Sequence, residues 1–468
     1  MLKGIGAGAL LAGTGMGVGA VGAFADDGAR IRRTYDAIVI GAGLAGVTAA
    51  RELRAKGLDV LVLEARDRTG GRTWTNTFNG VTIELGGEAV DEKQPNVWKE
   101  VERYNIALGT GLGADRMYMP TTSGGFEPLL TAQVFPKLKS LMTPFFDGSQ
   151  EMFPQPYQPL HRSDLVKPAD RLSFRDRLNQ LGLTPQDELW INGAIAGLAG
   201  GDARRGAYTH LMQTWALAGN TFEGFLSVNN KVPVAGTTAL VQSILGDARA
   251  DVRLNSPVTQ IQRDSTSVKV TTRSGLAFTG RVAVLAVPVN VWKNISFSPA
   301  LPSVYTQVST QGIGAPNVQK LWMLVKGTEG SFSTQPPEGS SLGAARPWAQ
   351  TPDGLVMYAF AYDPNLNTSR PKAVEAELRK AVPEARVTKV LAHNWARDPY
   401  ALGGWSVRWP GQLTGPYTTV QQPLDRLAFA SSDLANGWSG YMDGAIESGI
   451  TAATEVMRWL PARSVAHY

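Results

Sequence analysis

The fold is decided by residues 35–46, which read YDAIVIGAGLAG. Apart from Asp36, the first six residues are apolar and rich in β-branched side chains, a pattern typical of a buried parallel strand. The glycine-rich remainder predicts a tight turn, and residues 47–56 predict a helix that Gly57 ends. A second strand is expected over residues 58–63. This order predicts a βαβ unit.

The glycine turn has the spacing of a dinucleotide site. Gly41 makes the tight turn, Gly43 lets the backbone approach a pyrophosphate, and Gly46 lets the helix pack closely on the strand. Ala45 lies just before the predicted helix, whose N-terminal amide groups and dipole favour phosphate. Glu64, 23 positions after Gly41, can accept hydrogen bonds from the adenosine ribose. A turn of this kind also occurs without a ligand, but the surrounding strand, helix and acid favour dinucleotide binding.

The next motif favours FAD over NAD. Residues 63–73 read LEARDRTGGRT, in which Arg72 can hold a pyrophosphate as a bidentate partner. The alternative is a charged surface loop. The motif resembles the second fingerprint of the flavin amine oxidases, a family that includes monoamine, polyamine and L-amino acid oxidases. The resemblance implies cofactor contacts from a set of residues here: Ala65, Arg66, Gly71, Arg72 and Thr73.

Further blocks resemble this family in order along residues 35–461. They are the ELGGE sequence at residues 84–88, the strands of 252–272, the AVP and FSPALP sequences at 286–288 and 297–302, and the blocks at 427–433 and 440–449. The resemblance implies more cofactor contacts in these blocks: Gly87, Glu88, Val258, Asp433, Tyr441 and Met442.

The resemblance also implies a monoamine oxidase-like α/β fold with two domains. A discontinuous Rossmann-like FAD-binding domain would take residues 35–105, 230–295 and 415–461. An α+β substrate domain would take residues 106–229 and 296–414. Within the substrate domain, periodicity predicts helices over 173–183, 186–198, 210–218 and 371–381, strands over 319–325, 355–361 and 386–393, and a proline-rich break over 153–168.

Three residues are the expected catalytic groups. Amine oxidation passes a hydride equivalent to the flavin, so the protein must supply orientation, desolvation and charge. By resemblance, Lys320 would hold a water against the flavin N5 atom; the alternative is a strand lysine with its head in water. Trp405 and Tyr441 would be the two walls of an aromatic cage around the amine, and ordinary core packing is the alternative for both.

Two acids near this site are open to more than one interpretation. Glu88 could contact the flavin or pair with an arginine. Asp91 could attract a cationic amine or be an exposed loop acid. Gly404 stands where some monoamine oxidases carry a flavin-linked cysteine, and the chain has no cysteine at all. We therefore expect a non-covalent FAD.

Composition excludes several classes of function. The net charge of +5 is spread thinly, so the sequence does not indicate a nucleic-acid partner. The absence of cysteine removes disulfides and thiolate metal sites. The four histidines, His161, His210, His393 and His467, have no metal-ligand spacing and no nucleophile elbow beside them. We expect neither a metalloenzyme nor a hydrolase.

Residues 1–25 have the layout of an export signal. An uncharged run follows Lys3 and ends in Ala23-Phe24-Ala25. Its many glycines make it a poor transmembrane helix and give it the look of a twin-arginine leader, although no arginine pair precedes Lys3. We expect a periplasmic or exported protein, with a cytoplasmic protein or a membrane anchor as alternatives.

The sequence as a whole indicates an FAD-dependent amine oxidase. A hydride would pass from the carbon next to the amine nitrogen to flavin N5, the imine would hydrolyse, and O2 or a cytochrome would reoxidise the flavin, O2 giving H2O2. The last blocks and Trp405 look most like bacterial nicotine and pseudooxynicotine amine oxidases, enzymes of alkaloid degradation. The alternatives are a primary monoamine oxidase, a desaturase on the same fold or a flavin-bound protein without catalysis. We expect a homodimer.

Overall fold

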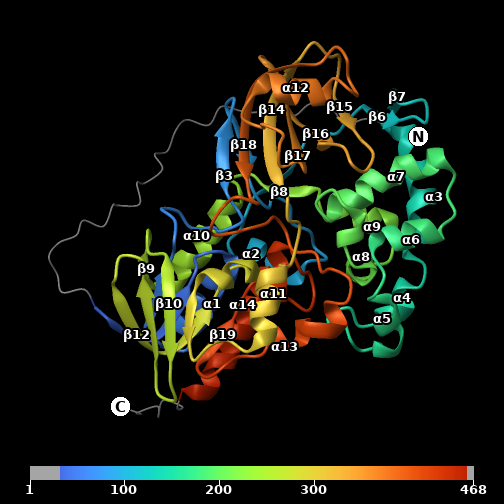
Figure 1. Cartoon of the computed structure of the whole chain (residues 1–468). Coiled ribbons are helices and arrows are strands. Elements are labelled where there is room, and N and C mark those ends of the chain that lie inside the picture. Colours follow the sequence, from blue (N-terminus) through green and yellow to red (C-terminus); the bar gives the residue numbers. More distant parts are fainter. Residues whose placement is uncertain (1–31, 461–468) are drawn as a thin grey trace. The chain divides into compact units, whose positions relative to one another are not determined.

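Strand β1 (Thr34–Ile40), helix α1 (Leu44–Ala55) and strand β2 (Val60–Leu63) form the expected βαβ unit in the computed structural model of the chain (Figure 1). The helix begins three residues earlier than predicted, since Gly43 is already its N-cap. The structure describes residues 32–460, and those from Thr34 onward belong to one structural unit. The leader expected over residues 1–25 and His467 lie outside the described residues.

The βαβ unit sits in an eight-stranded sheet of order β13-β10-β11-β12-β1-β2-β9, with β19 also paired to β12. β1 pairs in parallel with both β2 and β12. β12 pairs with two strands along one of its edges: residues 277–280 pair with β11, and residues 283–285 pair with β19. The other strands are β9 (Asp251–Arg253), β10 (Val258–Arg263), β11 (Val268–Thr272), β12 (Ala277–Leu285), β13 (Ser296–Ser298) and β19 (Leu427–Phe429).

The part of the fold built on this sheet also contains four helices: α2 (Pro95–Arg103), α10 (Thr237–Ala248), α11 (Ser303–Gln311) and α14 (Met442–Val456). α1 packs closely on α14: a Cβ atom at Gly449 would lie 2.4 Å from the Ala45 carbonyl oxygen. The Asp443 carboxylate accepts hydrogen bonds from the backbone N–H groups of Asn96 (2.6 Å) and Val97 (3.0 Å). This carboxylate therefore caps α2, whose own N-cap residue supplies no side-chain cap.

A second, antiparallel sheet has the order β16-β17-β14-β18. Its strands are β14 (Gln319–Lys326), β16 (Leu342–Thr351), β17 (Gly354–Ala361) and β18 (Arg386–Asn394), and helix α12 (Pro371–Leu378) packs on it. The three predicted strands and the predicted helix are confirmed with small boundary shifts. β16 was not predicted. Leu321 and Met323 of β14 face the α12 core, whereas Lys320 and Trp322 alternate to the other face.

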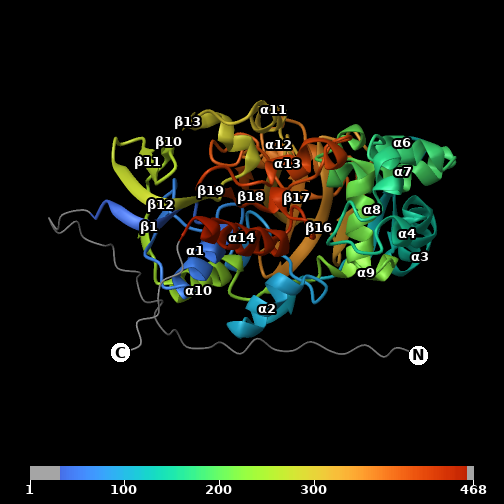
Figure 2. The same cartoon turned by 90° about the horizontal axis from the view of Figure 1, so that it is seen from below.

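Helices of residues 131–227 enclose a third core and gather away from β9–β12 in both Figure 1 and Figure 2. They are α3 (Thr131–Met142), α4 (Ser149–Met152), α5 (Ser163–Ala169), α6 (Phe174–Gln180), α7 (Pro185–Leu198), α8 (Tyr208–Leu217) and α9 (Phe222–Ser227). The predicted break over 153–168 was partly wrong, because α5 begins inside it and tolerates Pro168 near its end.

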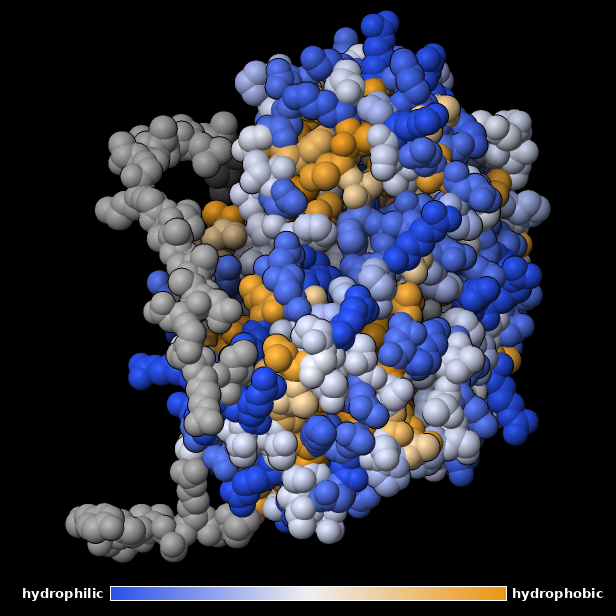
Figure 3. Space-filling view, turned by 60° about the vertical axis from the view of Figure 1, so that its left-hand side comes forward, coloured by the Kyte–Doolittle hydropathy of each residue, from blue (hydrophilic) through white to orange (hydrophobic). Residues whose placement is uncertain are grey.

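Short elements complete the fold: β3 (Thr75–Phe78) with β4 (Val81–Glu84), β5 (Leu108–Thr110) with β8 (Lys231–Pro233), a sheet of β6 (Arg116–Pro120), β7 (Phe126–Leu130) and β15 (Phe332–Thr334), and helix α13 (Thr418–Val420). On the face seen in Figure 3, apolar residues lie in small groups between polar ones. Within residues 32–460, none of the helices has the length and apolar character needed to cross a membrane.

Candidate functional site: a dinucleotide cradle and an aromatic pocket

Gly46 and Gly43, two of the three glycines in the turn of residues 41–46, differ in how closely other protein atoms approach them. A Cβ atom at Gly46 would lie 1.9 Å from the Gly41 carbonyl oxygen, so close packing inside the unit requires that glycine. A Cβ atom at Gly43 would meet nothing closer than 3.7 Å. Gly87, in the segment of residues 84–88, is similar: the nearest atom to a Cβ there is in the Thr73 side chain, at 3.7 Å. Both Cβ positions make only ordinary van der Waals contacts, so the space beside the backbone of Gly43 and Gly87 admits the approach of a cofactor.

Two helix N-termini lack a side-chain cap near this space. Gly43 caps α1 and Tyr441 caps α14, and neither residue contributes a side-chain hydrogen bond. Their first-turn N–H groups suit negatively charged oxygens. Ala45 and Met442 lie in these first turns, where the sequence predicts contacts to the cofactor. The residues present therefore fit a flavin dinucleotide.

Glu64 directly follows β2, and its carboxylate is held by the backbone. Its oxygens accept hydrogen bonds from the N–H groups of Ala42 (2.8 Å) and Arg66 (2.9 Å). These bonds fix the acid beside the glycine turn, which is the place expected for a ribose contact. Val258 begins β10, two residues after Ser256, whose N–H donates to the Glu64 carbonyl oxygen.

Arg72 joins the second fingerprint to the C-terminal block. Its guanidinium donates to the Gly404 carbonyl oxygen (3.1 Å) and to the hydroxyls of Ser431 (3.1 Å) and Ser432 (2.9 Å). It also forms an ion pair of 2.8 Å with Asp433. Thr73 closes the adjacent turn by donating to Gly70 (2.9 Å), and Gly71 takes a positive φ of 59° there.

The segment of residues 84–88 is fastened to the second sheet at three consecutive carbonyl groups. Trp322 donates to the Glu84 oxygen (2.9 Å), Trp395 to the Leu85 oxygen (2.8 Å) and Lys320 to the Gly86 oxygen (2.9 Å). These contacts span more than 230 residues of sequence. They place Glu88 beside the sheet.

Lys320, which is buried, and Glu88, which is partly buried, form an ion pair with 2.5 Å between Nζ and Oε2. The sequence alternative of an arginine partner for Glu88 was therefore wrong, and so was the alternative of a solvated lysine. The ammonium also lies 5.2 Å from the ring centre of Tyr358 and 5.7 Å from that of Phe360. Burial raises the pKa of the Tyr358 hydroxyl above its usual range, and the nearby Glu88 carboxylate adds to the shift.

Trp405 borders this site through Phe360, and Tyr441 belongs to a segment that touches the one after Trp405. The Trp405 indole donates to the Leu198 carbonyl oxygen (2.8 Å), and its ring meets Phe360 edge to face at 5.0 Å. The segments that follow Trp405 and precede Tyr441 touch, because a Cβ atom at Gly440 would lie 2.4 Å from the Ser406 oxygen. Burial raises the pKa of the Tyr441 phenol to about 12. The two expected cage walls thus lie on adjoining segments.

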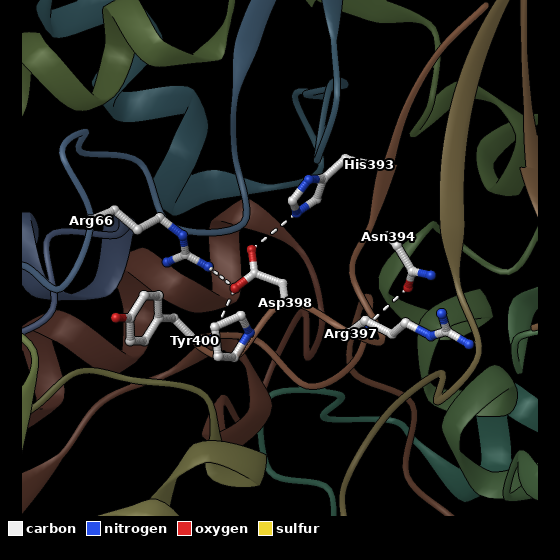
Figure 4. A pocket seen from close by; sticks show the side chains of 7 residues that line it. Arg66, His393, Asn394, Arg397, Asp398 and Tyr400 are labelled. Carbon is white, nitrogen blue, oxygen red and sulfur yellow. Dashed lines mark hydrogen bonds and ion pairs between the residues drawn. The ribbon is translucent and has the colours of Figure 1, made fainter. Parts of the chain in front are cut away.

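A shallow surface pocket of about 450 Å³ lies beside Arg66 and is lined by Arg66, His393, Asn394, Arg397, Asp398, Pro399 and Tyr400 (Figure 4). Asp398 accepts a hydrogen bond from Arg66 (2.6 Å) and lies 3.0 Å from His393 Nε2. Burial alone would raise the pKa of Asp398, but the bonds to His393 and Arg66 outweigh it and hold the pKa well below its usual range.

Sequence reasoning missed this carboxylate, although Asp398 stands in the segment that leads to Trp405. Ala65 lies between Glu64 and Arg66 in the same loop. Asp91 is neither exposed nor open to an amine: it is buried and accepts a hydrogen bond from the Lys93 N–H (2.9 Å). Among residues 32–460, no three His, Asp or Glu side chains come together as metal ligands would.

These features define a class. The sequence profile of the family described as flavin containing amine oxidoreductase matches residues 44–457. The chain belongs to this family, and its cofactor is FAD. Because the chain has no cysteine, no cysteinyl bond to the flavin can form.

Two bacterial relatives and one solved structure are similar to the chain over most of its length. The chain is 33% identical to a pseudooxynicotine dehydrogenase of Pseudomonas sp over 92% of its length and 88% of the relative's. It is 31% identical to a nicotine dehydrogenase of Pseudomonas putida (strain DSM 28022 / S16), covering 91% of this chain and 89% of that one. Among solved structures, a double mutant of putrescine oxidase superposes with a TM-score of 0.78 at 21% identity, covering 91% of this chain and 100% of that one.

Proposed function

We propose that the protein oxidises a secondary or heterocyclic amine of the nicotine or pseudooxynicotine type. The observation that carries the proposal is the continuous wall in which Tyr358, Phe360 and Trp405 follow one another beside the Lys320–Glu88 pair. Such a wall suits an aromatic amine, because ring faces bind both apolar rings and a developing positive charge. The names of the two Pseudomonas relatives support this substrate class.

Bound FAD supplies the two-electron chemistry by accepting a hydride equivalent from the carbon next to the amine nitrogen. The chain's own groups bind and orient the amine. Trp405 and Tyr441 confine it between aromatic faces, and the Lys320–Glu88 pair is the polar group beside it. The amine must be neutral at nitrogen before its C–H bond breaks, so one proton leaves the ammonium form first. Water then hydrolyses the released imine to a carbonyl compound and an amine.

Anaerobic mixing of the purified holoenzyme with a panel of amines tests the proposal. The panel holds nicotine, pseudooxynicotine, phenylethylamine, a diamine and L-amino acids, and the flavin absorbance reports reduction. Rapid bleaching by nicotine or pseudooxynicotine is expected. Admitting air or adding a cytochrome then identifies the electron acceptor.

Preferential bleaching by phenylethylamine or the diamine would move the substrate class to primary amines. A yellow protein that no amine bleaches would overturn the amine oxidase assignment and favour a desaturase on the same fold.

A further inference from the structure

The two members of the Lys320–Glu88 pair are buried to different extents. Lys320 keeps 1% of its side chain accessible, whereas Glu88 keeps 16%. Gly87, next to Glu88, is exposed as well. The carboxylate is therefore the accessible member of the pair, and the ammonium lies behind it.

The ammonium of Lys320 is also largely committed to the protein. It has three N–H donors. One goes to the Gly86 carbonyl oxygen (2.9 Å) and one to Glu88 Oε2 (2.5 Å). The rings of Trp322, Tyr358 and Phe360 lie 5.2–5.7 Å from Nζ. A carboxylate has about four lone-pair sites, so Glu88 keeps acceptor capacity after binding Lys320.

Charge favours the same arrangement. An amine substrate reaches the site as a cation, and an exposed ammonium would repel it, whereas a carboxylate attracts it and accepts its N–H bonds. Lys320 supplies the buried counter-charge that makes an ionised carboxylate tolerable at this depth. The fastening of residues 84–86 to Trp322, Trp395 and Lys320 keeps the carboxylate in place.

We propose that Glu88 is the polar group that this site presents to the amine and the flavin, and that Lys320 is a positioning residue acting through Glu88. The substrate part rests on the proposed function; the part that concerns the flavin does not. The competing arrangement is direct action of Lys320 at the flavin, with Glu88 as a passive counter-ion.

A double-mutant cycle in the substrate-free holoenzyme separates the two arrangements. Glu88→Gln, Lys320→Met and the double variant are compared by the visible absorption of bound FAD and by FAD affinity. We expect Glu88→Gln to change the spectrum, and Lys320→Met to change it only while Glu88 is present. The double variant replaces both charges by neutral groups of similar size and should fold even if a single variant does not.

Kinetics with the amine that bleaches the flavin best give a second measurement. We expect Glu88→Gln to lower kcat/KM by about a hundredfold, and Lys320→Met to lower it by about threefold or less in the Glu88→Gln background. Glu100→Gln is the matched control, because it breaks the buried Arg51–Glu100 pair (2.5 Å) away from the site. It should leave the flavin spectrum and kcat/KM unchanged.

Equal effects of Lys320→Met in both backgrounds would overturn the proposal, and so would an unchanged spectrum in Glu88→Gln. The spectral double-mutant cycle uses no amine, so its outcome does not depend on whether the substrate proposed above is correct.

Discussion

Alanine at Gly43 should weaken FAD binding without weakening the fold, whereas alanine at Gly46 should weaken the fold itself. The new methyl group at Gly43 would lie 3.7 Å from the Gly70 and Gly71 backbone, an ordinary van der Waals distance that the fold tolerates. At Gly46 it would lie 1.9 Å from the Gly41 carbonyl oxygen and 3.2 Å from the Ala286 side chain. The two alanine variants therefore distinguish a glycine that is required for FAD binding from a glycine that is required for packing within the same motif.

The stability effects follow from the local geometry. Gly43 has φ −78° and ψ 174°, which alanine adopts without strain. The poorer N-cap costs up to about 1 kcal/mol, and the stiffer unfolded chain returns about 0.4–1 kcal/mol. The free energy of unfolding should thus stay nearly constant. At Gly46 the contact is with backbone, so the loss should reach the upper part of the range of about 1–3 kcal/mol for overpacking.

The binding effect follows from what the methyl group displaces. A phosphate kept away from the α1 N-terminus loses charge-assisted hydrogen bonds of about 1.5–3 kcal/mol each. One lost bond raises the Kd for FAD by about 10- to 100-fold.

Flavin fluorescence measures FAD binding to the apoprotein, and the midpoint of thermal unfolding measures its stability. A folded Gly43→Ala variant that binds FAD as tightly as the parent would refute the approach of the pyrophosphate to Gly43. An unchanged midpoint in Gly46→Ala would refute the packing argument.

Three further predictions concern single side chains. Trp405→Ala should raise KM for the substrate amine about tenfold in steady-state assays, and Trp405→Phe, which keeps a ring face, should raise it less; equal effects would contradict a cage role. Because the pKa of Tyr441 is about 12, Tyr441→Phe should leave the shape of the kcat–pH profile unchanged below about pH 10, and a lost inflection would count against this. Burial raises the pKa of Glu447 to about 7, so the folded state keeps a proton that the unfolded state loses, and stability should fall by about 2–3 kcal/mol as pH rises from about 5 to 7. Thermal unfolding at several pH values should show this slope, and Glu447→Gln should flatten it; a slope kept in that variant would assign it to another group.

Local sequence patterns were enough to predict those parts of the site whose residues lie close together in the chain. The run from β1 to Glu64 was predictable because a buried strand, a glycine turn and an amphipathic helix each have a short period or a fixed spacing. The strands that carry Lys320 and Phe360 were predictable for the same reason. The start of α1 was not, because its N-cap is a glycine that the pattern assigns to the turn.

The surroundings of the acids could not be predicted in the same way. Asp398 pairs with Arg66 across 332 positions, and no sequence pattern near either residue indicates that the other is its partner. Asp91 resembled a loop acid, yet the structure buries it at 4% exposure. Burial and partners of a single charged residue depend on which segments fold against it, and spacing along the chain does not contain that information.

The amino-acid sequence by itself determined the dinucleotide-binding unit, because a βαβ unit and its glycines need only neighbouring residues to specify them, and the resemblance of its ordered blocks indicated the class of protein. It also determined that the flavin has no cysteinyl bond, since the chain contains no cysteine. Only the tertiary structure decided which group borders the reacting space. Lys320 and Glu88 are 232 positions apart. Three rings surround the ammonium on the sheet, whereas the carboxylate keeps 16% of its side chain accessible.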